Sequence, residues 1–244
     1  MTRILFVCHG NICRSPMAEF VMKELAQRAE KDRALYIASA ATSGEELGNP
    51  VYPPARRILM EHGIDCAGKL ARRIRPADYE AFDLLIGMDD ENLRDMERLF
   101  GGDSAGKLHR LLEYDGRPGA DLPDPWYTRD FESTWRDVYA GCFGLLRELF
   151  PQITLDFSGC SDRAGLYGEL RRRMLWEDWY GESLDALHDI LTGLRFLGKS
   201  FVFIMPVASA EQSCRDYAER IFGEFVEAGL PAAILTNNMD KAGE

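Results

Sequence analysis

The chain has 244 residues, of which 46% are hydrophobic, 28% charged and 11% aromatic, a composition typical of a soluble globular protein with one large domain or two unequal ones. No apolar run approaches the roughly 18 residues of a membrane span, and the short N-terminal apolar run does not fit a signal peptide, so we expect a cytoplasmic protein. The net charge of −11 argues against nucleic acid or an anionic membrane as a partner, because both would repel the protein.

The first 150 residues alternate short apolar runs with amphipathic segments. Such alternation predicts parallel strands with helices on both faces of the sheet. The expected elements are strands at 4–7, 35–40, 83–87 and 108–114, helices at 15–28, 54–62, 91–100 and 131–150, and a Gly/Pro/Asp loop at 116–126. We therefore predict an α/β domain over residues 1–150, with a four-stranded parallel sheet flanked by helices.

A second pattern begins at Pro151, almost without a linker, and this part of the chain is the more acidic per residue. The expected elements are strands at 153–157, 200–205 and 232–235, and helices at 165–176, 184–194 and 211–228. The sequence thus predicts a smaller α/β domain over residues 151–244, with a three-stranded parallel sheet.

The loop between the first strand and the first helix carries the reactive residues. It reads Cys8-His9-Gly10-Asn11-Ile12-Cys13-Arg14-Ser15. Backbone N–H groups can converge on an anion at such a place, and the helix dipole favours negative charge there. A cysteine that starts this loop is expected to be largely thiolate at neutral pH. Arg14, six residues later, can bind two oxygens of a phosphoryl group.

The run at 7–16 resembles the low-molecular-weight protein tyrosine phosphatase family, and the stretches at 39–43, 87–95 and 124–127 resemble it in family order. The resemblance implies hydrolysis of phosphotyrosine in two steps. Cys8 attacks phosphorus while Asp124 protonates the leaving oxygen, and water then hydrolyses the phosphocysteine with Asp124 as base. Arg14 and the loop amides hold the phosphoryl group, and no metal or other cofactor is needed.

Further residues are expected at the substrate site. The resemblance implies that Ser15 donates a hydrogen bond to Cys8 and that Asn11 holds the strained loop backbone. Trp126 and Tyr127 beside the acid would form aromatic walls for a phenyl ring. The expected substrate-binding residues are His9, Gly10, Asn11, Ile12, Cys13, Ser15, Glu45, Trp126 and Tyr127.

Two positions depart from the family pattern. Glu45 lies where many members have an aromatic rim residue, and Lys69 lies where a histidine often supports the loop. Ile12 favours phosphotyrosine, because members that act on phosphoarginine tend to carry threonine there, and a protein-arginine phosphatase is the alternative. Arsenate reduction would need further cysteines, which the sequence lacks between Cys66 and Cys142.

Simpler explanations exist for several assignments. Asp124 could only form a turn before Pro125, the two aromatic residues beside it could only pack, and Cys13 could be an inert buried thiol rather than a disulfide partner for oxidised Cys8. Core or surface thiols are expected at Cys66, Cys142, Cys160 and Cys214. The histidine spacings suggest no metal site.

The stretch at 179–193 resembles barstar, the intracellular inhibitor of the ribonuclease barnase. The resemblance implies an acidic and aromatic surface that plugs a basic ribonuclease site, with Trp179, Asp185, His188 and Asp189, and with Glu224 as a distant acidic partner. Independently, two aspartates four positions apart share one helix face and attract a cationic partner. The alternatives are a solvated acidic face, or a chain that is chiefly an inhibitor with a scaffold or regulatory phosphatase half.

Overall fold

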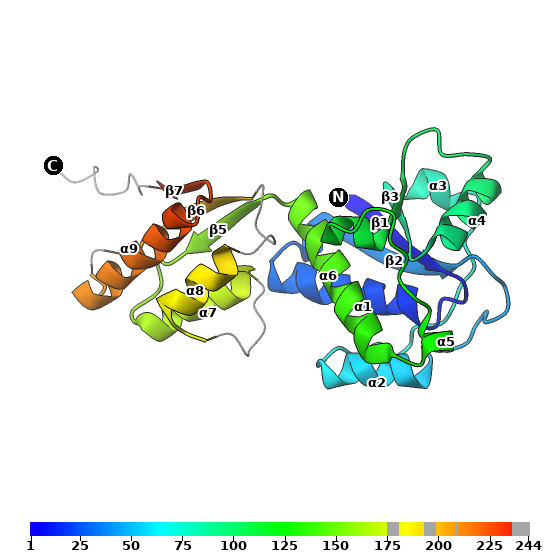
Figure 1. Cartoon of the computed structure of the whole chain (residues 1–244), viewed down its shortest axis with the longest axis horizontal. Helices are drawn as coiled ribbons and strands as arrows, with labels where there is room; N and C mark the ends of the chain where they lie inside the picture. Colours follow the sequence, from blue (N-terminus) through cyan, green and yellow to red (C-terminus); the bar gives the residue numbers. More distant parts are fainter. Residues whose placement is uncertain (175–180, 193–198, 208, 236–244) are drawn as a thin grey trace. The chain divides into compact units, whose positions relative to one another are not determined.

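The computed structural model in Figure 1 describes residues 1–174, 181–192, 199–207 and 209–235. The chain divides into two compact units, Met1–Glu148 and Leu149–Glu244. The predicted fold class is confirmed, since one sheet has four parallel strands and the other has three. Within the described ranges, no helix combines the length and the apolar character that crossing a bilayer requires.

The sheet of the first unit has a parallel topology that places a ligand site at one edge. Its strands are β1 (Thr2–Cys8), β2 (Leu35–Ala41), β3 (Leu84–Gly87) and β4 (Leu108–Arg110), in the order β2-β1-β3-β4. The chain leaves β1 toward β2 and then crosses back to β3, so the strand order reverses beside β1. Open α/β sheets bind ligands outside the carboxyl ends of the strands at such a point, and Cys8 ends β1 there.

Helices cover both faces of this sheet (Figure 1). The helices of the first unit are α1 (Arg14–Arg28), α2 (Pro53–Glu61), α3 (Asp78–Ala81), α4 (Asp90–Phe100), α5 (Pro125–Thr128) and α6 (Phe131–Leu149). The four residues of β1 from Ile4 to Val7 are fully buried, because the strand lies between two others and under helices on each face. Leu5 and Val7 share a core cluster with Met96 of α4.

The strand predicted at 108–114 is too long. β4 ends at Arg110, and a 3-10 helix, η2 (Leu111–Asp115), follows. Leu111 and Leu112 are both buried, and Leu111 lies close to Gly141 of α6, where the chain leaves the sheet. The predicted loop at 116–126 is also shorter than expected, because α5 begins at Pro125. Another 3-10 helix, η1 (Asp32–Ala34), and the four-residue α3 were not predicted, since single turns carry no hydrophobic period.

The second unit has the strands β5 (Gln152–Asp156), β6 (Ser200–Ile204) and β7 (Ala232–Leu235), in that order in the sheet, and the helices α7 (Arg163–Met174), α8 (Leu184–Leu191) and α9 (Gln212–Glu227). Its core is aromatic: the rings of Phe201 and Phe203 on β6 lie 4.6 and 5.0 Å from that of Phe225 on α9. Ser183 caps α8 by accepting a hydrogen bond from Ala186 N–H. The predicted helix ends at 176 and 194 lie outside the described residues.

Candidate active site

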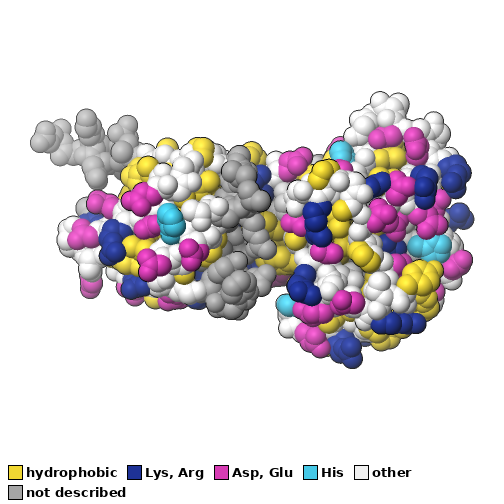
Figure 2. All heavy atoms as spheres, in the orientation of Figure 1, with side chains coloured by type: hydrophobic (Ala, Val, Ile, Leu, Met, Phe, Trp, Pro, Cys, Tyr) yellow, Lys and Arg dark blue, Asp and Glu magenta, His cyan; other side chains and the backbone are white. Residues whose placement is uncertain are grey.

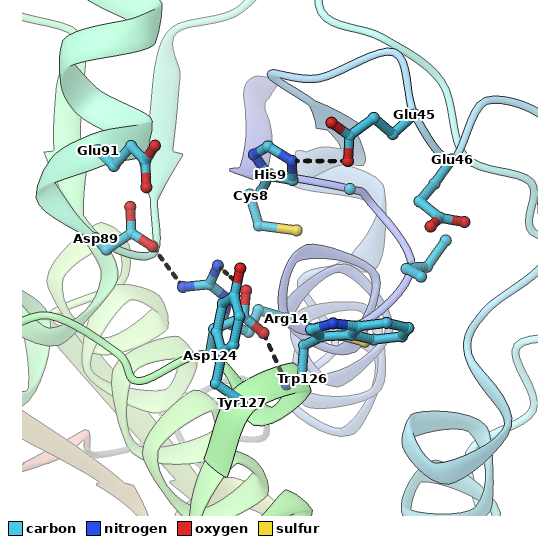
Figure 3. Close-up of a pocket in the computed structure, with 13 residues that line it drawn as sticks. Cys8, His9, Arg14, Glu45, Glu46, Asp89, Glu91, Asp124, Trp126 and Tyr127 are labelled. Carbon is cyan, nitrogen blue, oxygen red and sulfur yellow. Dashed lines mark hydrogen bonds and ion pairs between the residues drawn. The ribbon is translucent and has the colours of Figure 1, made fainter. Parts of the chain in front are cut away.

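A pocket opens at the carboxyl end of β1 (Figure 3). Its lining consists of Cys8, His9, Gly10, Ile12, Cys13, Arg14, Glu45, Glu46, Asp89, Glu91, Asp124, Trp126 and Tyr127. The fold thus brings the three expected catalytic residues together with most of the expected substrate-binding positions. Asn11 and Ser15 do not line the pocket and are buried.

Hydrogen-bond donors surround the Cys8 sulfur. The side chain is buried at the end of β1, where Sγ accepts a hydrogen bond from Asn11 N–H at 3.3 Å. Ser15 Oγ lies 3.1 Å from the same sulfur. The helix α1 begins at Arg14, so its positive end faces the loop. These donors suit an anion at the position of the sulfur or of a group bound beside it.

Asn11 fixes the shape of the loop. Its φ of 57° lies in the left-handed region, which a non-glycine residue adopts only at a cost. Its Nδ2 donates to Ser15 Oγ at 2.9 Å and to Ser39 Oγ at 2.8 Å, and its Oδ1 accepts from Arg72 N–H at 3.1 Å. The side chain thereby ties the loop to β2 and to the segment before α3.

A buried ion pair lies behind Asn11. Ser39 Oγ donates to Glu19 Oε2 at 2.6 Å, and Lys69 Nζ lies 2.7 Å from that oxygen. Burial alone would raise the pKa of Glu19, but the charge of Lys69 and the hydrogen bonds from Lys23, Lys69 and Ser39 outweigh it and hold the pKa below its usual value. Lys69 therefore supports the loop through Glu19, a partner that the sequence alone did not indicate.

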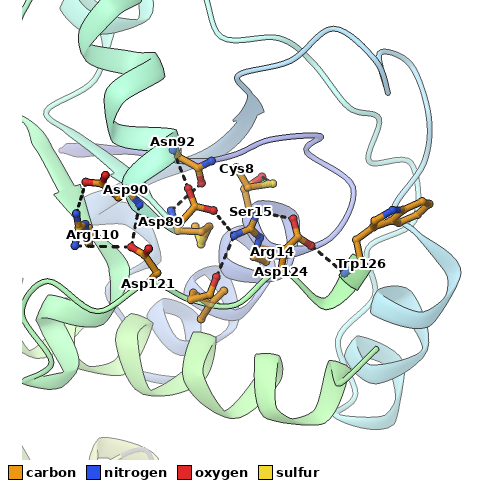
Figure 4. A network of polar contacts seen from close by, with 12 residues as sticks. Cys8, Arg14, Ser15, Asp89, Asp90, Asn92, Arg110, Asp121, Asp124 and Trp126 are labelled. Atoms are coloured by element: carbon orange, nitrogen blue, oxygen red, sulfur yellow. Dashed lines mark hydrogen bonds and ion pairs between the residues drawn. The ribbon is translucent and has the colours of Figure 1, made fainter. Parts of the chain in front are cut away.

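Arg14 is held by two carboxylates (Figure 4). Its Nη1 donates to Asp89 Oδ2 at 2.5 Å and to Leu122 O at 3.0 Å, and its Nη2 donates to Asp124 Oδ2 at 2.6 Å. Among the described residues, no acceptor lies within hydrogen-bonding distance of its buried Nε. Burial opposes the charge of Arg14, but the negative charges of Cys8, Asp124 and Asp89 outweigh burial and raise its pKa.

Asp89 and Asp124 both cap a helix and bind Arg14. Each is the N-cap of a short or medium helix: Asp89 Oδ1 accepts from Asn92 N–H at 2.8 Å before α4, and Asp124 Oδ1 accepts from Trp126 N–H at 2.9 Å before α5. The second oxygen of each carboxylate is left for Arg14. Asp89 was not singled out in advance, although a helix cap directly after β3 at the same sheet edge is a signal that could have found it.

The aromatic residues beside Asp124 lie at the mouth of the pocket (Figure 3). Tyr127 is 83% exposed and Trp126 is 42% exposed. The centroids of the Trp126 and Tyr52 rings are 5.2 Å apart, and Cζ of Arg129 lies 5.4 Å from the Trp126 ring centroid. Core packing therefore does not explain Tyr127, whereas a substrate ring would find an apolar surface beside the acid.

All six cysteines are free thiols in the structure. Burial raises the pKa of Cys13, and the nearby negative charges of Cys8 and Asp124 raise it further. Burial also raises the pKa of Cys160 to about 11.

In the second unit, the expected partner-binding residues that the structure describes lie on α8 and α9. Asp185 and Asp189 are exposed on α8. His188 Nδ1 lies 3.1 Å from Glu224 Oε2 on α9, so these two side chains contact each other. Trp179 lies outside the described residues.

Comparison with known proteins gives two family matches in tandem. Residues 3–154 match the low molecular weight phosphotyrosine protein phosphatase family, and residues 150–229 match the Barstar (barnase inhibitor) family. The first part is 38% identical over 150 residues to the low molecular weight protein-tyrosine-phosphatase YfkJ of Bacillus subtilis, an alignment that covers 61% of this chain and 96% of that protein. A Gallus gallus low molecular weight phosphotyrosine protein phosphatase is 36% identical, with 59% and 94% covered.

Solved structures agree with the sequence matches. The crystal structure of YfkJ from Bacillus subtilis superposes with a TM-score of 0.59 at 38% identity and covers 61% of this chain and 94% of that one. The Streptococcus pyogenes low molecular weight protein tyrosine phosphatase superposes with a TM-score of 0.56, also at 38% identity, with 62% and 94% covered.

Proposed function

Because this chain belongs to the low molecular weight phosphotyrosine protein phosphatase family, we propose that it hydrolyses phosphotyrosine and other aryl phosphate monoesters through a phosphocysteine intermediate. The observation that carries the proposal is the buried Arg14 guanidinium in the Cys8 pocket. Its Nε lacks an acceptor within the described part of the chain, and its Nη2 is held by the carboxylate that caps the short helix α5. A phosphoryl group supplies the two acceptors that an arginine fork requires.

In the first step, the Cys8 thiolate attacks phosphorus, the S–P bond forms and the P–O bond to the aryl group breaks. Protonated Asp124 gives its proton to the leaving oxygen, which departs as a phenol. Asp124 must release Arg14 for this step, so the incoming phosphate takes its place on Nη2. Arg14 and the amides of the loop then hold the oxygens of the transferring group.

In the second step, water attacks phosphorus, the S–P bond breaks and inorganic phosphate leaves. Asp124, now a carboxylate, accepts the proton of the water. The returning negative charge on Cys8 is stabilised by the hydroxyl of Ser15, 3.1 Å from Sγ, and by Asn11 N–H. These donors make the sulfur a better leaving group.

The test is hydrolysis of p-nitrophenyl phosphate, of a phosphotyrosine peptide and of a phosphoarginine peptide by the wild type, by Cys8→Ser and by the control Cys160→Ser. Cys160 lies in the second unit and outside the pocket. We expect full activity in the wild type and the control, and loss of hydrolysis in Cys8→Ser. Equal and negligible rates in all three would remove the enzymatic proposal, and faster hydrolysis of phosphoarginine peptides would replace tyrosine with arginine as the substrate residue.

We further propose that the unit beyond residue 150 binds a basic protein, such as a ribonuclease, through the exposed carboxylates of α8. The match of residues 150–229 to the Barstar family supports this proposal. Figure 2 shows acidic side chains near the histidine on this unit. Because His188 and Glu224 contact each other, Asp185 and Asp189 are the carboxylates best placed to meet a cationic partner.

Calorimetric titration of the full chain with barnase, a basic ribonuclease, tests this second proposal. We expect binding that Asp189→Asn weakens and that Glu219→Gln, an exposed carboxylate on α9, leaves unchanged. Absence of binding, or equal affinity in both variants, would contradict the proposed surface.

A further inference from the structure

The pocket around Cys8 carries an excess of negative charge. Of the residues that line it, Glu45, Glu46, Asp89, Glu91 and Asp124 are acidic, and one arginine, Arg14, opposes them. Two of the five, Asp89 and Asp124, are bound to that arginine and together outweigh its single positive charge. Three glutamates therefore remain around a site that has to accept a dianion.

These three glutamates, here called the acidic rim, come from two elements on opposite sides of the nucleophile. Figure 3 shows Glu45 and Glu46, from the segment after β2, on one side of His9, and Glu91, at the start of α4, on the other. The Glu45 side chain is 75% exposed and lies 3.4 Å from His9 Nε2. Glu91 is exposed as well, and Glu46 is half-buried. Most of the rim thus faces the solvent through which a substrate arrives.

The residue at the bottom of the pocket independently indicates that an oxyanion binds there. The Arg14 side chain is 3% exposed, and within the described residues its Nε finds no acceptor. A phosphoryl group satisfies that atom, but it must first pass the acidic rim. The carboxylates of the rim repel the two negative charges of a phosphate monoester. At physiological salt this repulsion acts within a screening length of about 8 Å, unless a nearby cation cancels it.

We infer that this site selects phosphotyrosine in segments that carry lysine or arginine beside the phosphorylated residue. The inference rests on the proposed phosphatase function and defines its substrate class. A flanking cation pairs with the glutamates of the rim and cancels the repulsion of the phosphate, whereas a flanking aspartate or glutamate adds to it. Glu45 and Glu91 act as specificity-determining residues that touch the neighbours of the phosphotyrosine rather than the reacting atoms.

The size of the preference follows from the exposure of the rim. An exposed ion pair contributes at most about fivefold to a binding constant, and two such pairs form at once on opposite sides of the mouth. We therefore expect kcat/KM for a phosphotyrosine peptide with Lys and Arg neighbours to exceed that for the same peptide with Asp and Glu neighbours by on the order of tenfold at low salt, and the ratio to fall as salt is added.

The experiment compares the two peptides and p-nitrophenyl phosphate, which has no neighbours, on three forms of the full chain. These are the wild type, the rim variant Glu45→Gln/Glu46→Gln/Glu91→Gln, and the control Glu80→Gln/Glu97→Gln/Glu132→Gln, whose exposed carboxylates lie outside the pocket. Both triple variants change the net charge equally. Only the rim variant is expected to lose the preference for the basic peptide.

Each outcome separates this inference from the proposed function. Hydrolysis of p-nitrophenyl phosphate without a preference for the basic peptide overturns the inference and leaves the phosphatase assignment standing. A preference that survives in the rim variant overturns it too, because the three glutamates are then not its cause. A preference that disappears equally in the control also overturns it, because the cause is then the total charge of the protein. Failure to hydrolyse any of the three substrates overturns the proposed function and the inference with it.

Discussion

Removing the charge of Asp124 is expected to strengthen phosphate binding while it slows hydrolysis. In the structure, Asp124 Oδ2 lies 2.6 Å from Arg14 Nη2, at the place that we assign to a phosphoryl oxygen. Asp124→Asn keeps an oxygen that can accept from Trp126 N–H, so the cap of α5 is retained. The amide carries no charge, so it neither competes strongly for Arg14 nor repels a bound phosphate.

The expected gain follows from the geometry. Two unit charges about 4 Å apart interact by roughly 4 kcal/mol at an effective dielectric constant of about 20. Asp124 is 23% exposed and regains hydration when it turns away, so we expect about a third of that energy, ~1.4 kcal/mol, or about tenfold tighter binding. Loss of the general acid should lower kcat by about 10²- to 10⁴-fold. This loss in kcat should be larger for phenyl phosphate than for p-nitrophenyl phosphate, because p-nitrophenolate is the better leaving group and departs more readily without a proton.

Phosphate affinity is measured as inhibition of p-nitrophenyl phosphate hydrolysis and by calorimetry in the Cys8→Ser background. Asp95→Asn, on α4 and outside the pocket, is the matched control and should bind phosphate as the wild type does. Unchanged or weaker phosphate binding in Asp124→Asn would show that the carboxylate does not compete for Arg14, and the exchange proposed for the first step would be wrong.

Four further predictions concern stability and reactivity. Lys69→Met removes a partner 2.7 Å from buried Glu19 and should lower the free energy of unfolding by about 3 kcal/mol, measured by urea denaturation. Since the fold lowers the pKa of Glu19 from 4.5, the stabilisation by this carboxylate should be complete above pH 4.5 and be lost as the pH falls below that value, as acid titration of the melting temperature will test. Gly144→Ala places a Cβ 1.9 Å from Tyr114 O and should destabilise the first unit by about 3 kcal/mol in calorimetry. Cys13, whose pKa is raised by burial, should remain unmodified by iodoacetamide at pH 8 in the folded protein, which mass spectrometry can follow.

The elements that the sequence predicts best are those whose burial is continuous or periodic. Ile4 to Val7 form an unbroken apolar run because β1 is covered on both faces, and the α4 region shows a helical period because one of its faces meets the sheet. The end of β4 could not be predicted, since the turn at Leu111 depends on how α6 packs. The Gly144 position lets that helix approach the Tyr114 carbonyl, a contact between residues 30 positions apart.

The candidate site also has a part that the sequence predicts and a part that only the fold reveals. The loop from Cys8 to Ser15 is contiguous, so its spacing alone predicts a nucleophile and an anion cradle. The two carboxylates that hold Arg14 come from 75 and 110 positions away, and only the fold shows that both bind it at once. Local patterns reveal what a residue can do, while the partners that restrain it come from the tertiary structure.

The loop from Cys8 to Ser15 already has the conformation that binds phosphate, whereas Arg14 must first exchange a partner. At the loop, the left-handed backbone of Asn11 costs about 1 kcal/mol, and its three side-chain hydrogen bonds, each contributing roughly 0.5–1.5 kcal/mol, more than offset that cost before any ligand binds. At Arg14, by contrast, one acceptor position is filled by Asp124 and must be exchanged. Binding of substrate therefore requires displacement of Asp124 from Arg14 but no rearrangement of the loop. Variants of Asn11 should act through loss of the loop shape and weaken phosphate binding, opposite in sign to the change expected at Asp124.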